Sequence, residues 1–463
     1  DAQLMARPAA FMDKKFDPTM LELGNLDDDL EKLGDCDIIF EVVIENLKIK
    51  QELFAKIEKV RKPNAIVASN TSGLPLAQMA KGRSKKFRKN FLIMHFFNPV
   101  RYMRLLEIVA GKDTDPDVLA YAAGWGEKVL GKGIVWSNDT PNFIGNRIGV
   151  YATAVIFDEI MESGLSLPEV DAIFGAPMGR PNTGVFGLAD LVGLDTIHHL
   201  LKNSNEMLKD DECRDSYAVP EWFQKMIDNK WLGNKTKQGF YKKVVAPDWT
   251  KKKLALNLDT VEYEEVVSEP SLECLQKAKK AKTTAEKMKA ILYGKDKGSK
   301  LAWKMSAAVS IYAANRIPEI ARSIVEIDNA MKWGYGWELG PFESWDAIGV
   351  KKSVAKMEAD GFTIPKRIKK MLASGNQTFY RMNKGKKQYL DLKTNRYKDV
   401  KLSDSMIFLS SLRKDKKVAI KNNSASLIDL ADGVFCLEYH TKMNAINDGI
   451  IEMLGKSVDH VAK

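Results

Sequence analysis

Cysteine and long apolar runs are the two things this chain of 463 residues has least of. Its four cysteines, Cys36, Cys213, Cys274 and Cys436, show no C-x-x-C spacing, which argues against a disulfide scaffold and a thiolate zinc site, and we expect no metal. This usage favours a reducing cytoplasm. No apolar run approaches the roughly 20 residues that span a bilayer. The first residues lack the basic and then apolar regions of a signal peptide.

Acidic residues are outnumbered, and the net charge is +10. Much of the excess lies in lysine clusters at 249–254, 277–282 and 413–421. Basic clusters can bind nucleic acid, but few aromatic residues are interleaved with these. We therefore expect solvated faces, or attraction of an anionic small molecule, and no nucleic-acid partner.

The first 138 residues alternate between short apolar runs and segments with helical spacing. Strands are expected at 37–44, 64–70, 91–97, 103–111 and 133–138, and helices at 46–60, 74–81 and 115–130. The near-continuous apolar run "DIIFEVVI" is typical of a strand buried on both faces. This alternation predicts a doubly wound, largely parallel sheet.

From residue 139 onwards helical patterns dominate. Asp139 or Thr140 is the expected N-cap of a long helix, with Pro141 in its first turn and Gly164 closing it. A lysine-rich stretch with few apolar residues, about 243 to 298, is interpreted as a partly helical linker. A second helical region follows, from about 300 to 375.

The two helical regions resemble each other. Residues 169–195 and 326–350 share Glu-apolar-Asp and then Gly-x-Phe-x3-Asp-x2-Gly, with one residue of insertion between the frames. Six matched positions in order make chance a poor explanation, and duplicated all-α modules follow. Residues 418–463 then change character, with a strand–turn–strand around Asp432-Gly433 and a helix. They begin a new unit that stops before it could bury a core, so we expect a domain that has been cut.

One of only five histidines, His95, lies at the end of an apolar run, and Glu107 lies on the next such run. If the two strands are antiparallel and centred near residue 101, residues whose numbers sum to 202 face each other, and 95 plus 107 is 202. A carboxylate there can accept one imidazole N–H and raise the basicity of the other nitrogen. The alternatives are a general acid/base pair and a satisfied core histidine with its own ion pair.

Other polar residues can meet His95 at the carboxyl ends of the strands, where α/β sheets bind ligands. Ser72, Asn98 and Asn146 are small hydrogen-bonding groups in "SNTSG", "HFFNP" and "DTPNFIGNR". Each has a plain alternative, since Ser72 could be a helix N-cap and Asn98 a turn former. Glu45 and Lys50 lie at a strand-to-helix junction, where isolated charges are usually solvated.

Together these motifs are specific. "DIIFEVVIENLKIKQELF", "SNTSG", "HFFNPVRYMRLLEIV" and "DTPNFIGNRI" resemble, in order and spacing, the NAD-dependent L-3-hydroxyacyl-CoA dehydrogenases of fatty-acid β-oxidation. The chain is most similar to the bacterial fusion in which an enoyl-CoA hydratase of the crotonase fold follows the dehydrogenase. Residues 418–463 resemble the start of that hydratase.

The resemblance implies a role for each candidate residue. His95 would be the base that takes the 3-hydroxyl proton, with Glu107 orienting it. Ser72 and Asn146 would hold the substrate oxygen or thioester. Glu45, Lys50, Ser72, Asn98 and Lys235 match positions that contact NAD in the family. Lys235 is the weakest match, because Lys237 stands where the family usually has glycine.

The chain also departs from the family. No G-x-G-x-x-G occurs in it, so the family's first strand and its phosphate-binding loop are expected to precede Asp1. The implied organisation is an N-terminally incomplete Rossmann-type α/β domain (1–138), two helical domains (139–242 and 300–417) joined by a linker (243–299), and the beginning of a crotonase domain (418–463). An acyl-CoA substrate is expected, and a homodimer and assembly with a thiolase both stay open. The alternative functions are another Rossmann hydroxyacid dehydrogenase and a non-catalytic CoA-binding or assembly module.

Overall fold

The computed structural model describes residues 20–245, 248–266, 270–383, 386–401, 407 and 409–462. The first nineteen residues of the predicted 1–138 domain therefore lie outside it. The chain forms two compact units, one of Asp1–Phe379 with Leu390–Arg396 and one of Tyr380–Tyr389 with Tyr397–Lys463. No helix within the described ranges is long and apolar enough to cross a membrane.

A five-stranded sheet opens the first unit, in the order β1-β2-β3-β4-β5. Its strands are β1 (Ile38–Glu41), β2 (Ile66–Ser69), β3 (Phe91–Phe96), β4 (Leu105–Ala110) and β5 (Gly133–Ser137), and its helices are η2 (Leu30–Asp35), α2 (Leu47–Val60), α3 (Leu76–Met79), α4 (Lys85–Lys89) and α5 (Pro116–Lys128). Neighbouring strands are parallel except β3 and β4. The predicted alternation of strands and helices, and the largely parallel sheet, are confirmed; α4 was not expected.

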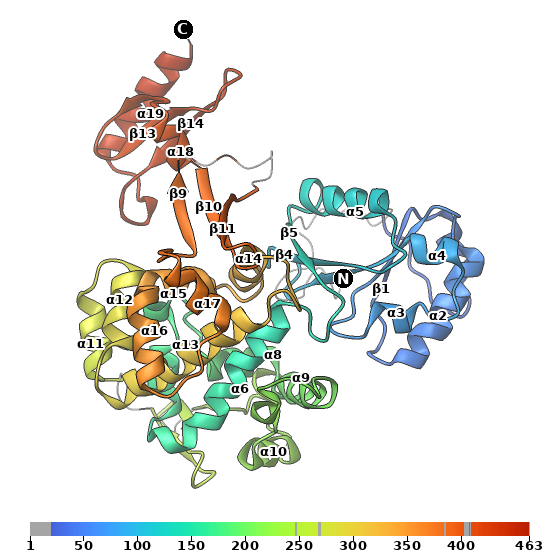
Figure 1. Ribbon diagram of the computed structural model, residues 1–463, viewed down its shortest axis with the longest axis horizontal. Helices are drawn as coiled ribbons and strands as arrows, with labels where there is room; N and C mark the ends of the chain where they lie inside the picture. Colours follow the sequence, from blue (N-terminus) through green and yellow to red (C-terminus); the bar gives the residue numbers. More distant parts are fainter. Residues whose placement is uncertain are drawn as a thin grey trace. The chain divides into compact units, whose positions relative to one another are not determined.

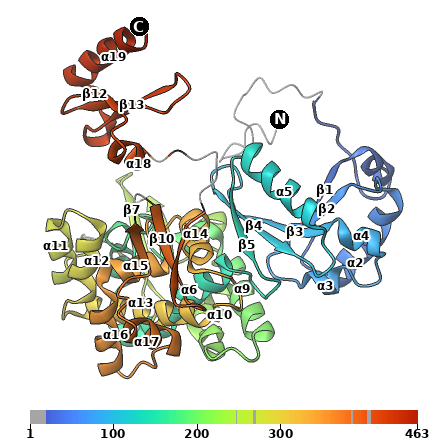
Figure 2. The ribbon, with the colours of Figure 1, turned by 45° about the horizontal axis from the view of Figure 1, so that its top comes forward.

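Apolar side chains cover both faces of this sheet. Phe54 of α2 and Phe87 of α4 pack with Val67 on one face, and Ala122 of α5 packs with Leu106 on the other. Figures 1 and 2 show α5 on one side of the sheet and α2 and α3 on the other. Burial on both faces explains why the strands are near-continuous apolar runs.

The first helical copy follows the sheet. It contains α6 (Gly145–Ser163), α7 (Leu167–Ile173), η3 (Ala176–Met178), α8 (Phe186–Val192), α9 (Leu194–Met207), η4 (Arg214–Tyr217), α10 (Glu221–Asp228), η5 (Asn234–Thr236) and a three-stranded sheet of β6 (Tyr241–Val245), β7 (Lys251–Leu256) and β8 (Tyr263–Glu265). The second copy contains α13 (Lys297–Asn315), α14 (Ile324–Gly334), α15 (Pro341–Ile348), α16 (Val350–Ala359) and α17 (Lys366–Ala373). A three-stranded sheet of β9 (Tyr380–Asn383), β10 (Lys386–Asp391) and β11 (Arg396–Asp399) follows it along the chain.

The same local device builds both copies. The Asp171 carboxylate accepts the backbone N–H of Phe186 at 2.7 Å, where α8 begins. The Asp328 carboxylate accepts the N–H of Phe342 at 2.8 Å, in the first turn of α15. In each case an aspartate on one helix caps the next helix and fixes the turn between them.

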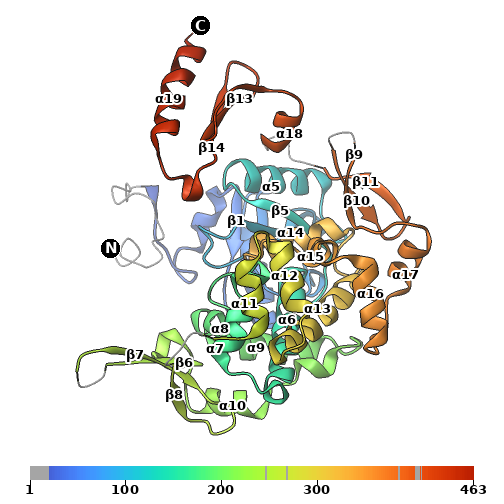
Figure 3. The same ribbon diagram turned by 90° about the vertical axis from the view of Figure 1, so that its left-hand side faces the viewer.

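The second aspartate of the matched motif also makes the same kind of contact in each copy. Asp190 accepts the N–H of Phe240 at 2.8 Å, and Asp346 accepts the N–H of Phe379 at 2.7 Å. Between α8 and α9, and between α15 and α16, the chain turns at a glycine with positive φ, 104° at Gly193 and 92° at Gly349. These shared contacts support the predicted duplication, but the first copy is not all-α, because it includes the sheet of β6, β7 and β8. The copies also pack on each other, with α6 alongside α13 (Figure 3).

The stretch expected as a linker is folded. Besides β7 and β8 it forms α11 (Glu273–Lys280) and α12 (Thr284–Leu292). Leu275, Met288 and Ile291 are buried, and α12 packs against α13 and α15. Its few apolar residues lie at helical spacing, which is enough to anchor two amphipathic helices despite the many lysines.

The last described segment contains α18 (Leu409–Lys414), β12 (Val418–Lys421), β13 (Ala425–Asp429), β14 (Phe435–Tyr439), η6 (Lys442–Asn444) and α19 (Asp448–Val461). β13 and β14 pair as an antiparallel hairpin, so the strand–turn–strand and helix predicted there are confirmed. Leu427, Ile450 and Met453 form a small buried cluster.

Candidate functional site

His95 and Glu107 form a buried pair in the middle of the sheet. They are direct partners in the antiparallel register of β3 and β4, as the sum of 202 predicts. His95 Nδ1 and Glu107 Oε2 are 2.7 Å apart, and the two residues are only 4% and 0% exposed. A short contact between a ring nitrogen and a buried carboxylate fixes both the orientation of the ring and its tautomer.

The other carboxylate oxygen of Glu107 is tied to the start of α6. Oε1 accepts the backbone N–H of Ile144 at 3.0 Å and of Gly145 at 2.8 Å. These are amides that a helix N-terminus leaves without an intrahelical partner, and its dipole favours negative charge. Both oxygens of Glu107 are therefore occupied by donors, and the Nδ1–H tautomer of His95 leaves a lone pair on Nε2 for a ligand.

Aromatic rings line the histidine. The ring centroids of Phe97 and Phe143 lie 4.7 and 5.5 Å from that of His95. Phe143 has a φ of 49° and Asn142 one of 63°, a left-handed backbone that non-glycine residues adopt at some energetic cost and that clusters at functional sites. This turn places the Phe143 ring against His95 and the next two amides against Glu107.

The predicted N-cap of the long helix is wrong. α6 begins at Gly145, not directly after Asp139 or Thr140, because residues 139–144 form the turn that reaches Glu107. Asp139 instead accepts the N–H of Leu76 at 3.0 Å and so ties this turn to the loop after β2. Burial raises the pKa of Asp139, although the N–H groups of Leu76 and Ala77 act against the rise. The expected end of the helix at Gly164 is confirmed.

Replacing Glu107 with Gln is expected to lower kcat by about 10²-fold, within the range that a positioned acid/base contributes. Glutamine has one acceptor oxygen for two sets of donors. Its NH2 group must therefore face either the Nδ1–H of His95 or the backbone N–H groups of α6, which cannot accept from it. Steady-state kinetics of E107Q beside E162Q, a change at an exposed residue near the end of α6, would check this. Equal kcat in the two variants would contradict it.

Glu45, Lys50 and Ser72 meet at the carboxyl ends of β1 and β2. Lys50 is 1% exposed and pairs with Glu41 at 2.7 Å and with Glu45 at 3.4 Å. The interpretation of Lys50 as a solvated charge is therefore wrong, because the strand end supplies carboxylates that offset its burial. Glu45 also accepts the N–H of Ser72 at 3.2 Å and a hydrogen bond from the Thr71 hydroxyl.

The remaining candidates lie in different settings. Ser72 is not a helix N-cap, since Pro75 precedes α3. Asn98 is exposed, in the turn that joins β3 to β4. Asn146 lies in the first turn of α6 and is 9% exposed.

Lys235 lies apart from these groups. It forms an ion pair with Asp195 of α9, and both side chains are about half exposed. Within the described residues no partner of Lys235 comes from the sheet domain. Its assignment to the cofactor remains a prediction that this ion pair does not support.

Some polar residues of the site were not predicted. Glu41, the last residue of β1, accepts hydrogen bonds from Lys50 at 2.7 Å and from the Ser69 hydroxyl at 2.6 Å. Lys132 donates to the carbonyl of Met103 at 2.8 Å and to that of Val100, holding the turn that carries Asn98. A charged residue at the carboxyl end of an apolar strand is the signal that could have identified Glu41.

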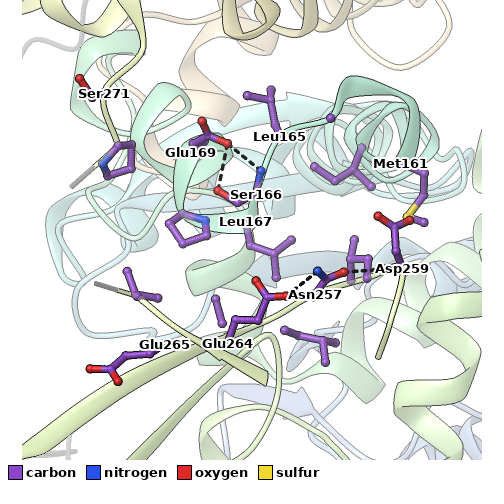
Figure 4. A pocket seen from close by; sticks show the side chains of 18 residues that line it. Met161, Leu165, Ser166, Leu167, Glu169, Asn257, Asp259, Glu264, Glu265 and Ser271 are labelled. Atoms are coloured by element: carbon purple, nitrogen blue, oxygen red, sulfur yellow. Dashed lines mark hydrogen bonds between the residues drawn. The ribbon is translucent and has the colours of Figure 1, made fainter. Parts of the chain in front are cut away.

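A cavity of about 620 Å³ lies elsewhere, between the α6–α7 turn and the β7–β8 hairpin. Figure 4 shows Glu169 and Glu264 on its wall, where Glu169 is hydrogen-bonded to Ser166 and Glu264 to Asn257. None of the predicted site residues lines it. In the described part of the chain, no group of three or more His, Cys, Asp or Glu side chains is arranged to hold a metal ion.

Comparison with known proteins shows the family of the chain. The family model "3-hydroxyacyl-CoA dehydrogenase, NAD binding domain" matches residues 4–140, and the model of the C-terminal domain of that family matches residues 143–243. A "Probable 3-hydroxyacyl-CoA dehydrogenase" of Deinococcus radiodurans is 43% identical over 240 residues, which cover 52% of this chain and 68% of the relative. The chain belongs to the 3-hydroxyacyl-CoA dehydrogenase family. NAD is the cofactor of the matched N-terminal domain.

Longer members of the family match almost the whole chain. A "Probable 3-hydroxyacyl-CoA dehydrogenase" of Bacillus subtilis is 44% identical over 464 residues, 99% of this chain and 57% of the relative. A "Putative fatty acid oxidation complex trifunctional enzyme" of Rickettsia felis is 32% identical over 460 residues, 98% of this chain and 58% of the relative. The chain thus spans between half and two thirds of the length of these two relatives.

Proposed function

We propose that the protein is an NAD-dependent dehydrogenase that oxidises the 3-hydroxyl of L-3-hydroxyacyl-CoA to the 3-ketone in fatty-acid β-oxidation. The observation that carries the proposal is the buried His95–Glu107 pair, whose carboxylate is held by the amides of α6. Membership of the 3-hydroxyacyl-CoA dehydrogenase family and the names of the longer relatives support the substrate class.

His95 is proposed as the catalytic base. With Nδ1–H donated to Glu107, its Nε2 lone pair accepts the proton of the substrate hydroxyl as the C3 hydrogen leaves. The imidazolium that forms lies 2.7 Å from a buried carboxylate, which stabilises it more strongly than water would. Phe97 and Phe143 exclude water from the ring's flanks.

Ser72 and Asn146 are proposed to hold the substrate oxygen. Asn146 lies one residue after Gly145, whose amide binds Glu107, so its side chain and the base are fixed by the same helical turn. A hydroxyl and an amide placed beside the reacting carbon can donate to the oxygen on which charge changes during the reaction.

The residues present fit the nicotinamide half of NAD. Glu45 is a partly exposed carboxylate at the carboxyl ends of the strands, and it accepts hydrogen bonds from Thr71 and Ser72. It can also accept hydrogen bonds from the hydroxyl groups of a ribose. The buried Lys50 forms ion pairs with Glu41 and Glu45 and so fixes their positions. Asn98 adds an exposed amide. NAD, when bound, supplies the acceptor for the hydride. We keep Lys235 in this set only as a prediction.

We further propose the domain division 1–138, 139–242, 243–299, 300–417 and 418–463, with the last segment beginning a crotonase-fold hydratase. The hairpin of β13 and β14 and the exposed apolar residues of α19, Ile451 at 59% and Val458 at 68%, support a larger domain around this segment. The four free cysteines support a reducing compartment. Assembly as a homodimer or with a thiolase stays a prediction for sedimentation analysis.

The test of the main proposal is NADH oxidation by the full-length polypeptide with acetoacetyl-CoA, followed by absorbance. We expect formation of L-3-hydroxybutyryl-CoA. Oxidation of NADH with a free keto acid but not with the thioester would favour a hydroxyacid dehydrogenase instead. Binding of the thioester without turnover would favour a non-catalytic CoA-binding module. Hydration of crotonyl-CoA by the same preparation tests the hydratase proposal separately.

A further inference from the structure

The second helical copy places one side chain at the candidate site. Tyr335, directly after α14, donates its hydroxyl to Asn146 Oδ1 at 3.0 Å. Its ring lies edge-on to Phe97, with centroids 6.1 Å apart, and Phe97 in turn contacts His95. One residue of the second copy thus contacts both the proposed substrate-binding amide and the wall of the proposed base.

The ring of Tyr335 packs against α6 at a glycine. A Cβ on Gly149, in the same helix as Asn146, would lie 2.1 Å from Tyr335 Cζ and 2.4 Å from its hydroxyl oxygen. A Cβ on Gly334 would meet Leu105 at 2.5 Å and Phe97 at 3.2 Å. The glycine at 149 lets the phenol approach α6, and the glycine at 334 lets the end of α14 approach Leu105 and Phe97.

The duplication shows that the hydroxyl is not needed to pack the copies. Gly179 and Gly336 stand at the same separation from the capping residues Asp171 and Asp328, and both have positive φ, 65° and 67°. Tyr335 therefore corresponds to Met178 in the first copy. Met178 is buried, so the first copy fills this position with an apolar side chain that has no hydroxyl.

We propose that Tyr335 is a positioning residue of the dehydrogenase site, which occupies the oxygen of the Asn146 amide so that its NH2 group faces the substrate oxygen. This rests on the proposed function. An amide has one acceptor oxygen and one donor nitrogen, and a donor bound to the oxygen selects between its two orientations.

Tyr335 is a hydrogen-bond donor at neutral pH. Burial, and then the negative charge of Glu107, raise the pKa of Tyr335, so the phenol holds its proton at neutral pH. Among the described residues, its O–H donates to Asn146 Oδ1.

Y335F tests the proposal because it removes the hydroxyl and keeps the ring. For the full-length enzyme with acetoacetyl-CoA we expect kcat about 10-fold lower, the loss of one well-placed hydrogen bond, with the Kd of NADH and the melting temperature unchanged. Y121F, at a tyrosine 57% exposed on α5, is the matched control and should equal the wild type.

A double-mutant cycle with N146A separates positioning from packing. If Tyr335 acts through Asn146, Y335F has no further effect on kcat in the N146A background. An unchanged kcat in Y335F, or an equal loss of kcat in the wild-type and N146A backgrounds, would overturn this proposal. The proposed function would still hold as long as the wild type is active. A wild type that does not reduce acetoacetyl-CoA would overturn the proposed function and this proposal with it.

Discussion

Replacing His95 with Gln is expected to lower kcat by about 10²–10⁴-fold, the contribution of a positioned general acid/base, and to leave KM little changed. Glutamine fills much of the same volume and can still donate to Glu107, so the buried carboxylate keeps a partner. It has no group that takes up a proton near neutral pH. The loss should therefore fall on the chemical step, and steady-state kinetics with acetoacetyl-CoA and NADH would measure it.

The matched control is His199→Gln, at an exposed position of α9. We expect its kcat and KM to equal those of the wild type. If H95Q retained a kcat within a factor of about three of the wild type, less than any positioned acid/base contributes, His95 would be a core histidine with its own ion pair, and the catalytic assignment would be wrong.

The second large effect is expected at the junction of the two helical copies. Asp211, after α9, has a side chain that is 1% exposed and pairs with Arg316 at 2.8 Å and with Arg147 of α6. The Tyr312 hydroxyl of α13 donates to the same carboxylate at 2.8 Å. One buried anion thus offsets two arginines drawn from both copies, and its removal leaves them only the partly exposed carboxylates of Glu212 and Glu319 as partners.

D211N is expected to lower the free energy of unfolding by about 3 kcal/mol at pH 7. This is the low end of the range for breaking a buried ion pair, because Glu212 and Glu319, each partly exposed, still pair with the arginines. Urea unfolding of D211N beside D210N, a change at the exposed neighbouring aspartate, would measure it. A difference below about 1 kcal/mol between the two variants would show that the network does not stabilise the junction.

The effect of D211N should depend on pH. Burial acts to raise the pKa of Asp211, but the Cys213 N–H, Arg316, the Tyr312 hydroxyl and Arg147 together lower it below its usual 3.8. A carboxyl whose pKa is lower in the folded chain stabilises the fold above its unfolded pKa and loses that contribution as the pH falls through the folded pKa. The difference in the free energy of unfolding between wild type and D211N should be largest near pH 7 and should decrease below pH 3.8.

Local patterns predicted the sheet and the facing positions of His95 and Glu107. His95 and Glu107 were placed opposite each other by counting from one turn, because register in an antiparallel pair follows from the turn position. The duplicated helices were likewise visible, since Asp171 and Asp328 each carry a cap that constrains their neighbours along the chain.

Features that depend on distant contacts were not predictable in this way. The start of α6 is set by Glu107, 38 residues away from Gly145, which outweighed the local N-cap signal of Asp139. Lys50 is buried because Glu41 and Glu45 end a strand beside it, and no property of the lysine itself indicates this. Tyr335 and Asn146 are 189 residues apart, a pairing that only the packing of one copy on the other creates.

The two helical copies belong to one polypeptide, and this has a consequence for how the protein behaves on dilution. Separate chains that complete each other's sites fall apart as their concentration drops, and their stability falls with it. Here α6 and α13 are joined by the chain itself, so each finds the other at an effective concentration that does not change with the amount of protein. Specific activity should therefore be the same at nanomolar and micromolar enzyme, and every molecule carries its own Tyr335.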